Sequence, residues 1–173
     1  KALLSRHLDL ARLAQLRDDE ALDDSEWRRL TAAAPAQARE MLQTEGYFEP
    51  QISVQREPGT PIRVRLTVLP GPRVQVASLA VRSAGELATP LAAGQADARQ
   101  LDQALQTAGP LRPGQAFRNP LWSETKLQWI STLRAAGYAA ALIESSAAEV
   151  DVATASATLS GVVDRGPRFP AGA

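Results

Sequence analysis

The residue types that most often perform catalysis or bind metal ions are few in this chain, and they do not form a recognisable site. The only histidine is His7, and the chain contains no cysteine. Neither a Gly-x-Ser-x-Gly nucleophile motif nor a phosphate-binding glycine loop occurs. Acidic residues cluster at 18–20 and 23–24, where we interpret them as solvated helix ends rather than as a cation site. The sequence therefore predicts a protein that is not an enzyme and has no catalytic, cofactor-binding or metal-binding residues.

The composition limits the partners that the chain could have. Its 173 residues are 45% hydrophobic, which suits one large domain or two small ones. Nineteen basic and 19 acidic residues give a formal net charge of zero, so no overall field favours nucleic acid or an anionic membrane. No apolar run approaches the roughly 20 residues that span a bilayer. The chain begins at Lys1 without methionine, and we expect it to be a piece of a longer protein.

One pattern of elements occurs twice. Each copy has a helical stretch that ends in Gly-Tyr, then two strands, then Gly-Pro-Arg, and equivalent positions lie about 90 residues apart, far beyond a solenoid repeat. We therefore predict two tandem modules, at residues 1–71 and 72–166, with a linker or the start of a following module at 167–173. The markers are Gly46-Tyr47, 64–68 and Gly71-Pro72-Arg73 in the first copy, and Gly137-Tyr138, 157–163 and Gly166-Pro167-Arg168 in the second.

The first copy is predicted to hold two helices and a hairpin. Apolar residues at helical spacing predict a helix over 8–16 and a second one that ends before Gly46, which is expected to adopt the left-handed conformation. Pro35 is expected to kink or break the second helix. Alternating apolar residues predict strands at 47–54 and 62–69, separated by a turn. No opening strand is recognisable, so we expect this module to be truncated at its start.

The second copy is predicted to hold three strands and two helices. The opening strand covers 74–81, with a bulge after Val76 because the alternation slips there. One helix opens at Asp97, and another is expected to be capped by Asn119. A strand at 139–143, a connection near 144–146 and a strand at 157–163 complete the module. The predicted fold class is α+β: two tandem β-α-α-β-β modules, each a three-stranded sheet covered by two helices.

Such a sheet leaves backbone groups unpaired along its rim. The hairpin makes the third strand central, so the second strand lies at an edge. An extended peptide can add to such an edge through main-chain hydrogen bonds that depend little on sequence. We therefore identify four candidate protein-binding residues in each second strand: Gln51, Ile52, Ser53 and Val54 in the first copy, and Ala140, Ala141, Leu142 and Ile143 in the second.

Several of these motifs together resemble a known family. In the second copy, Gly114-x-x-Phe117, the stretch 136–140 and the stretch 166–169 look like those of POTRA domains, the modules that precede outer-membrane barrels of the BamA superfamily. In the first copy, residues 42–50 and 64–72 are similar to the TamA family, the barrel subunit of the translocation and assembly module.

The resemblance implies a function that the composition alone does not. It implies a location on the periplasmic side of the outer membrane of a Gram-negative bacterium, and a role in assembling outer-membrane proteins, autotransporters included. It further implies an inner-membrane-anchored TamB-like partner, unfolded outer-membrane or autotransporter clients, and a C-terminal barrel outside this sequence. The family contributes no catalytic residues.

Three alternatives remain open at this point. The modules could be rigid spacers that bind no client, or they could belong to another POTRA-bearing protein: a further BamA-superfamily member, a two-partner secretion transporter or a cell-division protein. The tryptophans could anchor an interface, although their helical spacing favours packing between helix and sheet. These tryptophans are Trp27, Trp122 and Trp129.

Overall fold

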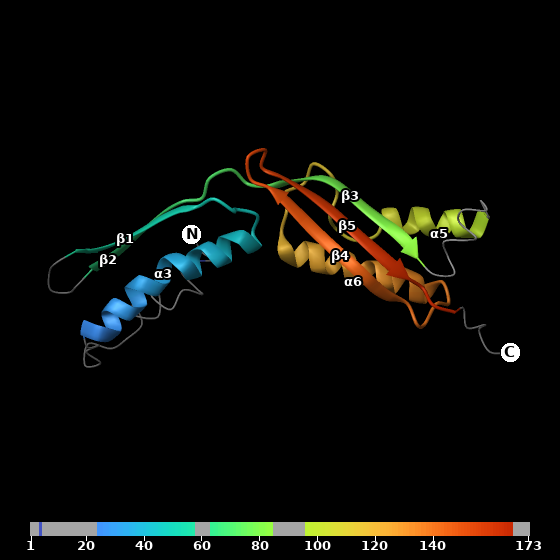
Figure 1. Cartoon of the computed structure of the whole chain (residues 1–173), viewed down its shortest axis with the longest axis horizontal. Helices are drawn as coiled ribbons and strands as arrows, with labels where there is room; N and C mark the ends of the chain where they lie inside the picture. Colours follow the sequence, from blue (N-terminus) through green and yellow to red (C-terminus); the bar gives the residue numbers. More distant parts are fainter. Residues whose placement is uncertain (1–3, 5–23, 58–62, 85–95, 168–173) are drawn as a thin grey trace. The chain divides into compact units, whose positions relative to one another are not determined.

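The computed structural model describes residue 4 and residues 24–57, 63–84 and 96–167. The chain divides into two compact units, Lys1–Arg73 and Val74–Ala173 (Figure 1). The predicted helix over 8–16 lies outside the described residues, as do His7, the acidic cluster at 18–20 and Asp23.

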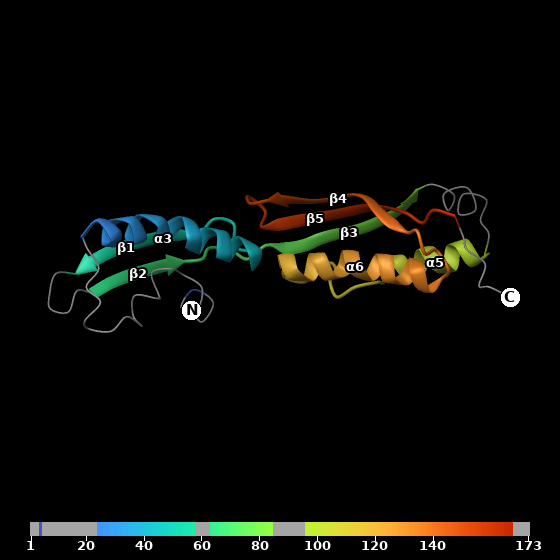
Figure 2. The same cartoon turned by 90° about the horizontal axis from the view of Figure 1, so that it is seen from below.

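The first unit packs one long helix against a hairpin. Helix α3 (Asp24–Thr44) is followed by strands β1 (Gln51–Glu57) and β2 (Arg63–Leu69), which pair antiparallel from Gln51–Leu69 to Glu57–Arg63. Figures 1 and 2 show α3 lying along the hairpin. The helix buries one stripe of side chains spaced four residues apart, as its sequence predicts: Leu30, Ala34, Ala38 and Leu42.

The predictions for the helix and the sheet of the first unit have different outcomes. Helix α3 continues through Pro35, so the expectation of a break at this proline was wrong. The sheet has two strands among the residues described, and the absence of a recognisable opening strand therefore stays a prediction. Gly46 has a φ of 92°, and the Tyr47 N–H donates to the Leu42 carbonyl at 2.9 Å, which is the glycine-terminated helix end that the sequence predicts.

The second unit has the predicted β-α-α-β-β order. Its sheet is ordered β3-β5-β4, with β3 parallel and β4 antiparallel to the central β5. The register shift between Val76 and Ser78 confirms the predicted bulge in β3. Helices α5 and α6 lie on one side of the sheet (Figure 2). The elements are β3 (Gln75–Ala84), α5 (Ala96–Gln106), α6 (Asn119–Ala135), β4 (Leu142–Asp151) and β5 (Ser156–Asp164).

The core of the second unit lies between α6 and the central strand. Trp129 is fully buried, and its ring meets that of Trp122 edge to face, with centroids 5.4 Å apart. Both belong to the buried core together with alternate residues of β5, namely Ala157, Leu159 and Val163. The interpretation of Trp122 and Trp129 as core residues is confirmed.

Two predicted boundaries in the second unit were wrong. Helix α6 begins at Asn119 itself and Arg118 is its N-cap, so Asn119 does not cap the helix, although Pro120 does occupy its first turn. Strand β4 does not stop at residue 143 but continues to Asp151, and the connection to β5 covers residues 152–155. The predicted connection near 144–146 is therefore part of the strand.

Candidate protein-binding edges of the sheets

The outer edge of β4 is the most accessible strand edge that the structure describes. Strand β4 is the last in the sheet order, so only one of its sides is paired. All six residues at 144–149 are exposed, and because successive strand residues point to opposite faces, both faces of this stretch are open. An incoming chain could reach the edge from either side.

The side chains of this stretch explain its exposure. On the face toward the helices, Ser146 and Ala148 lie opposite Gly161 and Leu159 of β5. Leu159 is fully buried, whereas both β4 residues are exposed, so the helix layer covers β5 but not this part of β4. The small serine and alanine side chains leave the backbone of β4 accessible along the edge.

The far end of β4 is fixed by a turn at Asp151. Its Oδ1 accepts hydrogen bonds from the backbone N–H groups of Ala153 (2.9 Å) and Thr154 (3.3 Å). Hydrogen bonds from the Thr154 side chain, then from these backbone groups, stabilise the carboxylate and lower the pKa of Asp151 below its usual value of 3.8. This turn holds β4 and β5 in register.

Lowering the pH below about 3.8 is expected to weaken the β4–β5 turn. Because the folded-state pKa is depressed, the stabilisation from Asp151 is present above the unfolded-state value near 3.8 and is lost as the pH falls through the lower folded-state pKa. A carboxyl-carbon NMR titration would measure it. Thr154→Ala is expected to raise the pKa of Asp151, and Thr158→Ala is the matched control. An unchanged pKa in Thr154→Ala would contradict this assignment.

The opposite edge of the same sheet is partly sealed by the chain itself. The Val76 N–H donates to the Gln115 carbonyl (2.8 Å), the Val76 carbonyl accepts from Gly114 (2.7 Å), and the Val74 carbonyl accepts from Phe117 (2.8 Å). Further along β3, the side-chain amide of Gln106 donates to the Val81 carbonyl at 2.7 Å. Segment 114–117 therefore occupies the first part of the β3 edge and makes β4 the better candidate.

In the first unit, β1 and β2 each have one side that no other described strand pairs. The apolar side chains of β1, Ile52 and Val54, are half-buried, whereas Gln51 and Ser53 are exposed. The outer side of β1 is therefore a second candidate edge.

The predicted binding residues fall into two groups. Gln51, Ile52, Ser53 and Val54 lie in β1, and Leu142 and Ile143 open β4. Ala140 lies in a turn before β4, and Ala141 is buried with its N–H bonded to the Tyr138 carbonyl at 3.1 Å, so placing these two in an edge strand was wrong. Residues 144–151, which form most of the exposed edge, were not among the predicted binding residues.

The described residues contain no group of three or more histidine, cysteine or acidic side chains that could hold a metal ion. Within the same part of the chain, no helix has the length and apolar character needed to cross a membrane.

Comparison with known families identifies the first unit. Residues 10–70 match the family described as "POTRA domain TamA domain 1". Residues 10–70 are therefore similar to a POTRA domain. The matched segment ends at Pro70, one residue beyond β2, and within the described residues it includes α3 and the β1–β2 hairpin. The resemblance seen in the sequence of the first copy is thereby confirmed.

Solved structures similar to this chain also come from POTRA-bearing proteins. Haemophilus influenzae BamA POTRA3-5 is 18% identical, with 97% of this chain and 61% of that chain covered and a TM-score of 0.46. H. influenzae BamA POTRA4 is 22% identical, with 56% and 97% covered and a TM-score of 0.39. BamA from Haemophilus ducreyi lacking POTRA domains 1-3 is 14% identical, with 93% and 26% covered and a TM-score of 0.40. No curated protein matches the chain.

Proposed function

We propose that this chain is the periplasmic POTRA region of an outer-membrane barrel protein of the TamA type. In this role it takes part in assembling outer-membrane proteins, autotransporters included, by holding extended polypeptides at its sheet edges. The family match over residues 10–70 supports the class of protein. The single observation that carries the binding role is the β4 edge, which is exposed on both faces over residues 144–149.

The chemistry of such an edge suits many different clients. In an antiparallel pair, each strand uses half of its backbone groups toward one neighbour, so β4 retains N–H and C=O groups directed outward. Each hydrogen bond gained by an added strand contributes about 0.5–1.5 kcal/mol net. Several such bonds give useful affinity without requiring a particular client sequence.

The edge can be tested with an unfolded peptide taken from an outer-membrane barrel strand. A photo-reactive residue at Ala147, in the exposed part of β4, is expected to crosslink to the peptide. The matched position is Gln75, an exposed residue at the start of β3, where segment 114–117 lies along the edge. Crosslinking at Ala147 at least fivefold above Gln75 would support edge binding. Equal or no crosslinking at the two positions would favour the rigid spacer.

We propose a TamB-like protein anchored in the inner membrane as the resident partner, and unfolded outer-membrane proteins as clients. The same β4 edge can receive a strand from either. Crosslinking inside cells from Ala147 and from Ser53 of β1, followed by mass spectrometry, would identify the partner at each edge. Recovery of neither class of protein at either position would count against this proposal. The barrel is tested separately by the sequence of the longer protein: if it lacks alternating strand segments of about 10 residues, the barrel is excluded.

A further inference from the structure

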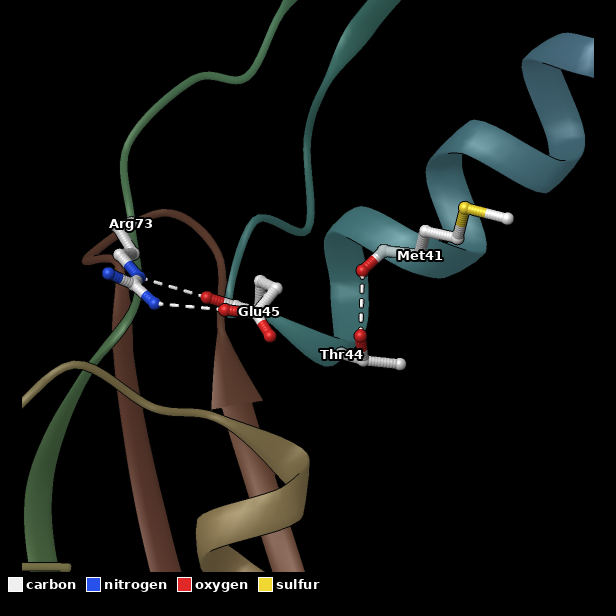
Figure 3. A network of polar contacts seen from close by, with 4 residues as sticks. All are labelled: Met41, Thr44, Glu45 and Arg73. Carbon is white, nitrogen blue, oxygen red and sulfur yellow. Dashed lines mark hydrogen bonds and ion pairs between the residues drawn. The ribbon is translucent and has the colours of Figure 1, made fainter. Parts of the chain in front are cut away.

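The segment that joins the two units is bound to the first unit by its last residue. The Arg73 Nε donates to the backbone carbonyl of Glu45 at 2.9 Å, and a terminal guanidinium nitrogen lies 3.5 Å from the Glu45 carboxylate. Figure 3 shows both contacts, with Glu45 at the end of α3. The guanidinium carbon also lies 5.3 Å from the centre of the Tyr47 ring.

The end of α3 is a favourable place for a cation. The last carbonyls of a helix lack helical partners and carry the negative end of its dipole. In α3, the Leu42 and Gln43 carbonyls accept from the N–H groups of Tyr47 and Gly46, and Met41 accepts from the Thr44 hydroxyl at 2.7 Å. The Glu45 carbonyl is bound by Arg73 instead. The arginine thus binds the first residue after α3 from 28 residues further along the chain.

A second contact fixes the middle of the segment. Gly71 has a φ of 73°, and a Cβ atom at this position would lie 3.0 Å from the Glu49 carbonyl oxygen. Pro70 and Pro72 on either side of it have restricted backbones. The stretch 70–73 therefore lies against the first unit at two points.

The next residue belongs to the second unit. Val74 is only 2% exposed, and its carbonyl accepts a hydrogen bond from the Phe117 N–H at 2.8 Å. The N–H of Gln75 donates to the Ala155 carbonyl at 3.0 Å. The last residue held by the first unit, Arg73, and the first residue buried in the second unit, Val74, are therefore adjacent in the sequence.

We propose that Arg73 is an anchor that restricts motion between the two units. While its side chain holds the end of α3, rotation is confined to the bonds around the single peptide between Arg73 and Val74. When Arg73 is released, the joint lengthens to residues 72–73, as far as the close approach of Gly71 to the Glu49 carbonyl. The anchor thus sets the range over which the two modules can present their edges to one polypeptide, although the inference itself does not depend on client binding.

Spin labels on the full chain test this inference. Because the chain has no native cysteine, labels can be attached at two introduced cysteines, Arg39→Cys in α3 and Gln128→Cys in α6, both at exposed positions. Arg73→Ala is expected to broaden the distribution of distances between the labels at least twofold. The matched control is Arg65→Ala, which removes an exposed arginine paired with Glu57 at 2.7 Å, away from the joint. An equal width for Arg73→Ala and the unchanged chain would overturn the proposal.

A further variant separates the anchor from a simple ion pair. The shorter bond of Arg73 is to the Glu45 backbone, which Glu45→Gln leaves in place, so this variant is expected to keep the narrow distribution. A distribution as broad as that of Arg73→Ala would show that the carboxylate holds the joint and would overturn the backbone anchor. A label pair within the first unit, at Arg39 and Thr67, reports on folding, and its distance is expected to be unchanged in Arg73→Ala. Broadening of this pair would attribute the effect to unfolding and refute the anchor.

Discussion

Replacing Gly109 by alanine is expected to lower the free energy of unfolding of the second unit by about 2–5 kcal/mol. Gly109 follows α5 and has a φ of 87°, and a Cβ atom there would lie 2.6 Å from the Thr125 Cα and 2.8 Å from its Cβ. Thr125 is fully buried in α6, so neither backbone can move away freely. Urea unfolding in a Trp27→Phe background, followed by the fluorescence of Trp122 and Trp129, would measure the loss.

A second glycine separates the two contributions to this cost. Gly114 has nearly the same backbone angle, a φ of 85°, but no atom lies within 4 Å of where its Cβ would be. Gly114→Ala is therefore expected to lower the free energy of unfolding only by the cost of the left-handed backbone conformation, about 1–2 kcal/mol. If the two substitutions destabilise the second unit equally, the close approach of Gly109 to α6 contributes nothing and the prediction is wrong.

The features that the sequence predicted well depend on short stretches of chain. Both helix ends marked by Gly-Tyr are present, with φ values of 92° at Gly46 and 93° at Gly137. Each is fixed by residues within one helical turn, because only glycine adopts this conformation at little cost. The bulge in β3 was predicted for the same reason, since a slipped alternation is visible within a few residues.

Strand β4 was underestimated because its sequence lacks the usual strand signals. Residues 144–149 are Glu-Ser-Ser-Ala-Ala-Glu, with neither β-branched nor aromatic side chains, and such residues are uncommon in strands. The strand is stabilised by its pairing with β5, whose register covers β4 from Leu142 to Asp151. One available signal was Asp151 itself, because an aspartate that begins a turn is typical of a hairpin.

Contacts between distant backbone segments could not be predicted from the sequence. The sealing of the β3 edge by residues 114–117 uses main-chain groups that every residue type carries. The repeat also suggested that Arg73 and Arg168 are equivalent. Arg168 lies outside the described residues, and in the second unit it is Arg165 whose guanidinium lies 4.4 Å from the Tyr138 ring and bonds its hydroxyl. The arginine–tyrosine contact is thus present in both units, but the arginine comes from a different position of the repeat in each.

The role of Gly161 as a packing site was likewise missed, because a glycine in a strand carries no hydrophobic signal. Its residue pairs are Val81 on β3 and Ser146 on β4, so it lies in the centre of the sheet. The six-membered ring of Trp129 occupies the space that a side chain would fill, with a Cβ at Gly161 placed 2.8 Å from the Trp129 Cη2. The absence of a side chain at Gly161 therefore makes room for the ring of Trp129 in the core.

Gly161→Ala is accordingly expected to destabilise the second unit by about 1–3 kcal/mol. The fully buried Trp129 has Trp122 against its ring and cannot turn aside without disturbing the core, which outweighs the gain of about 0.4–1 kcal/mol from a less flexible unfolded chain. The control Ser160→Ala, at an exposed neighbouring position, is expected to change stability by less than about 0.5 kcal/mol. In the background Trp129→Leu, urea unfolding should show Gly161→Ala to be nearly neutral, because the clashing ring is gone. An undiminished cost in that background would mean that the backbone of β5, and not the tryptophan, requires glycine.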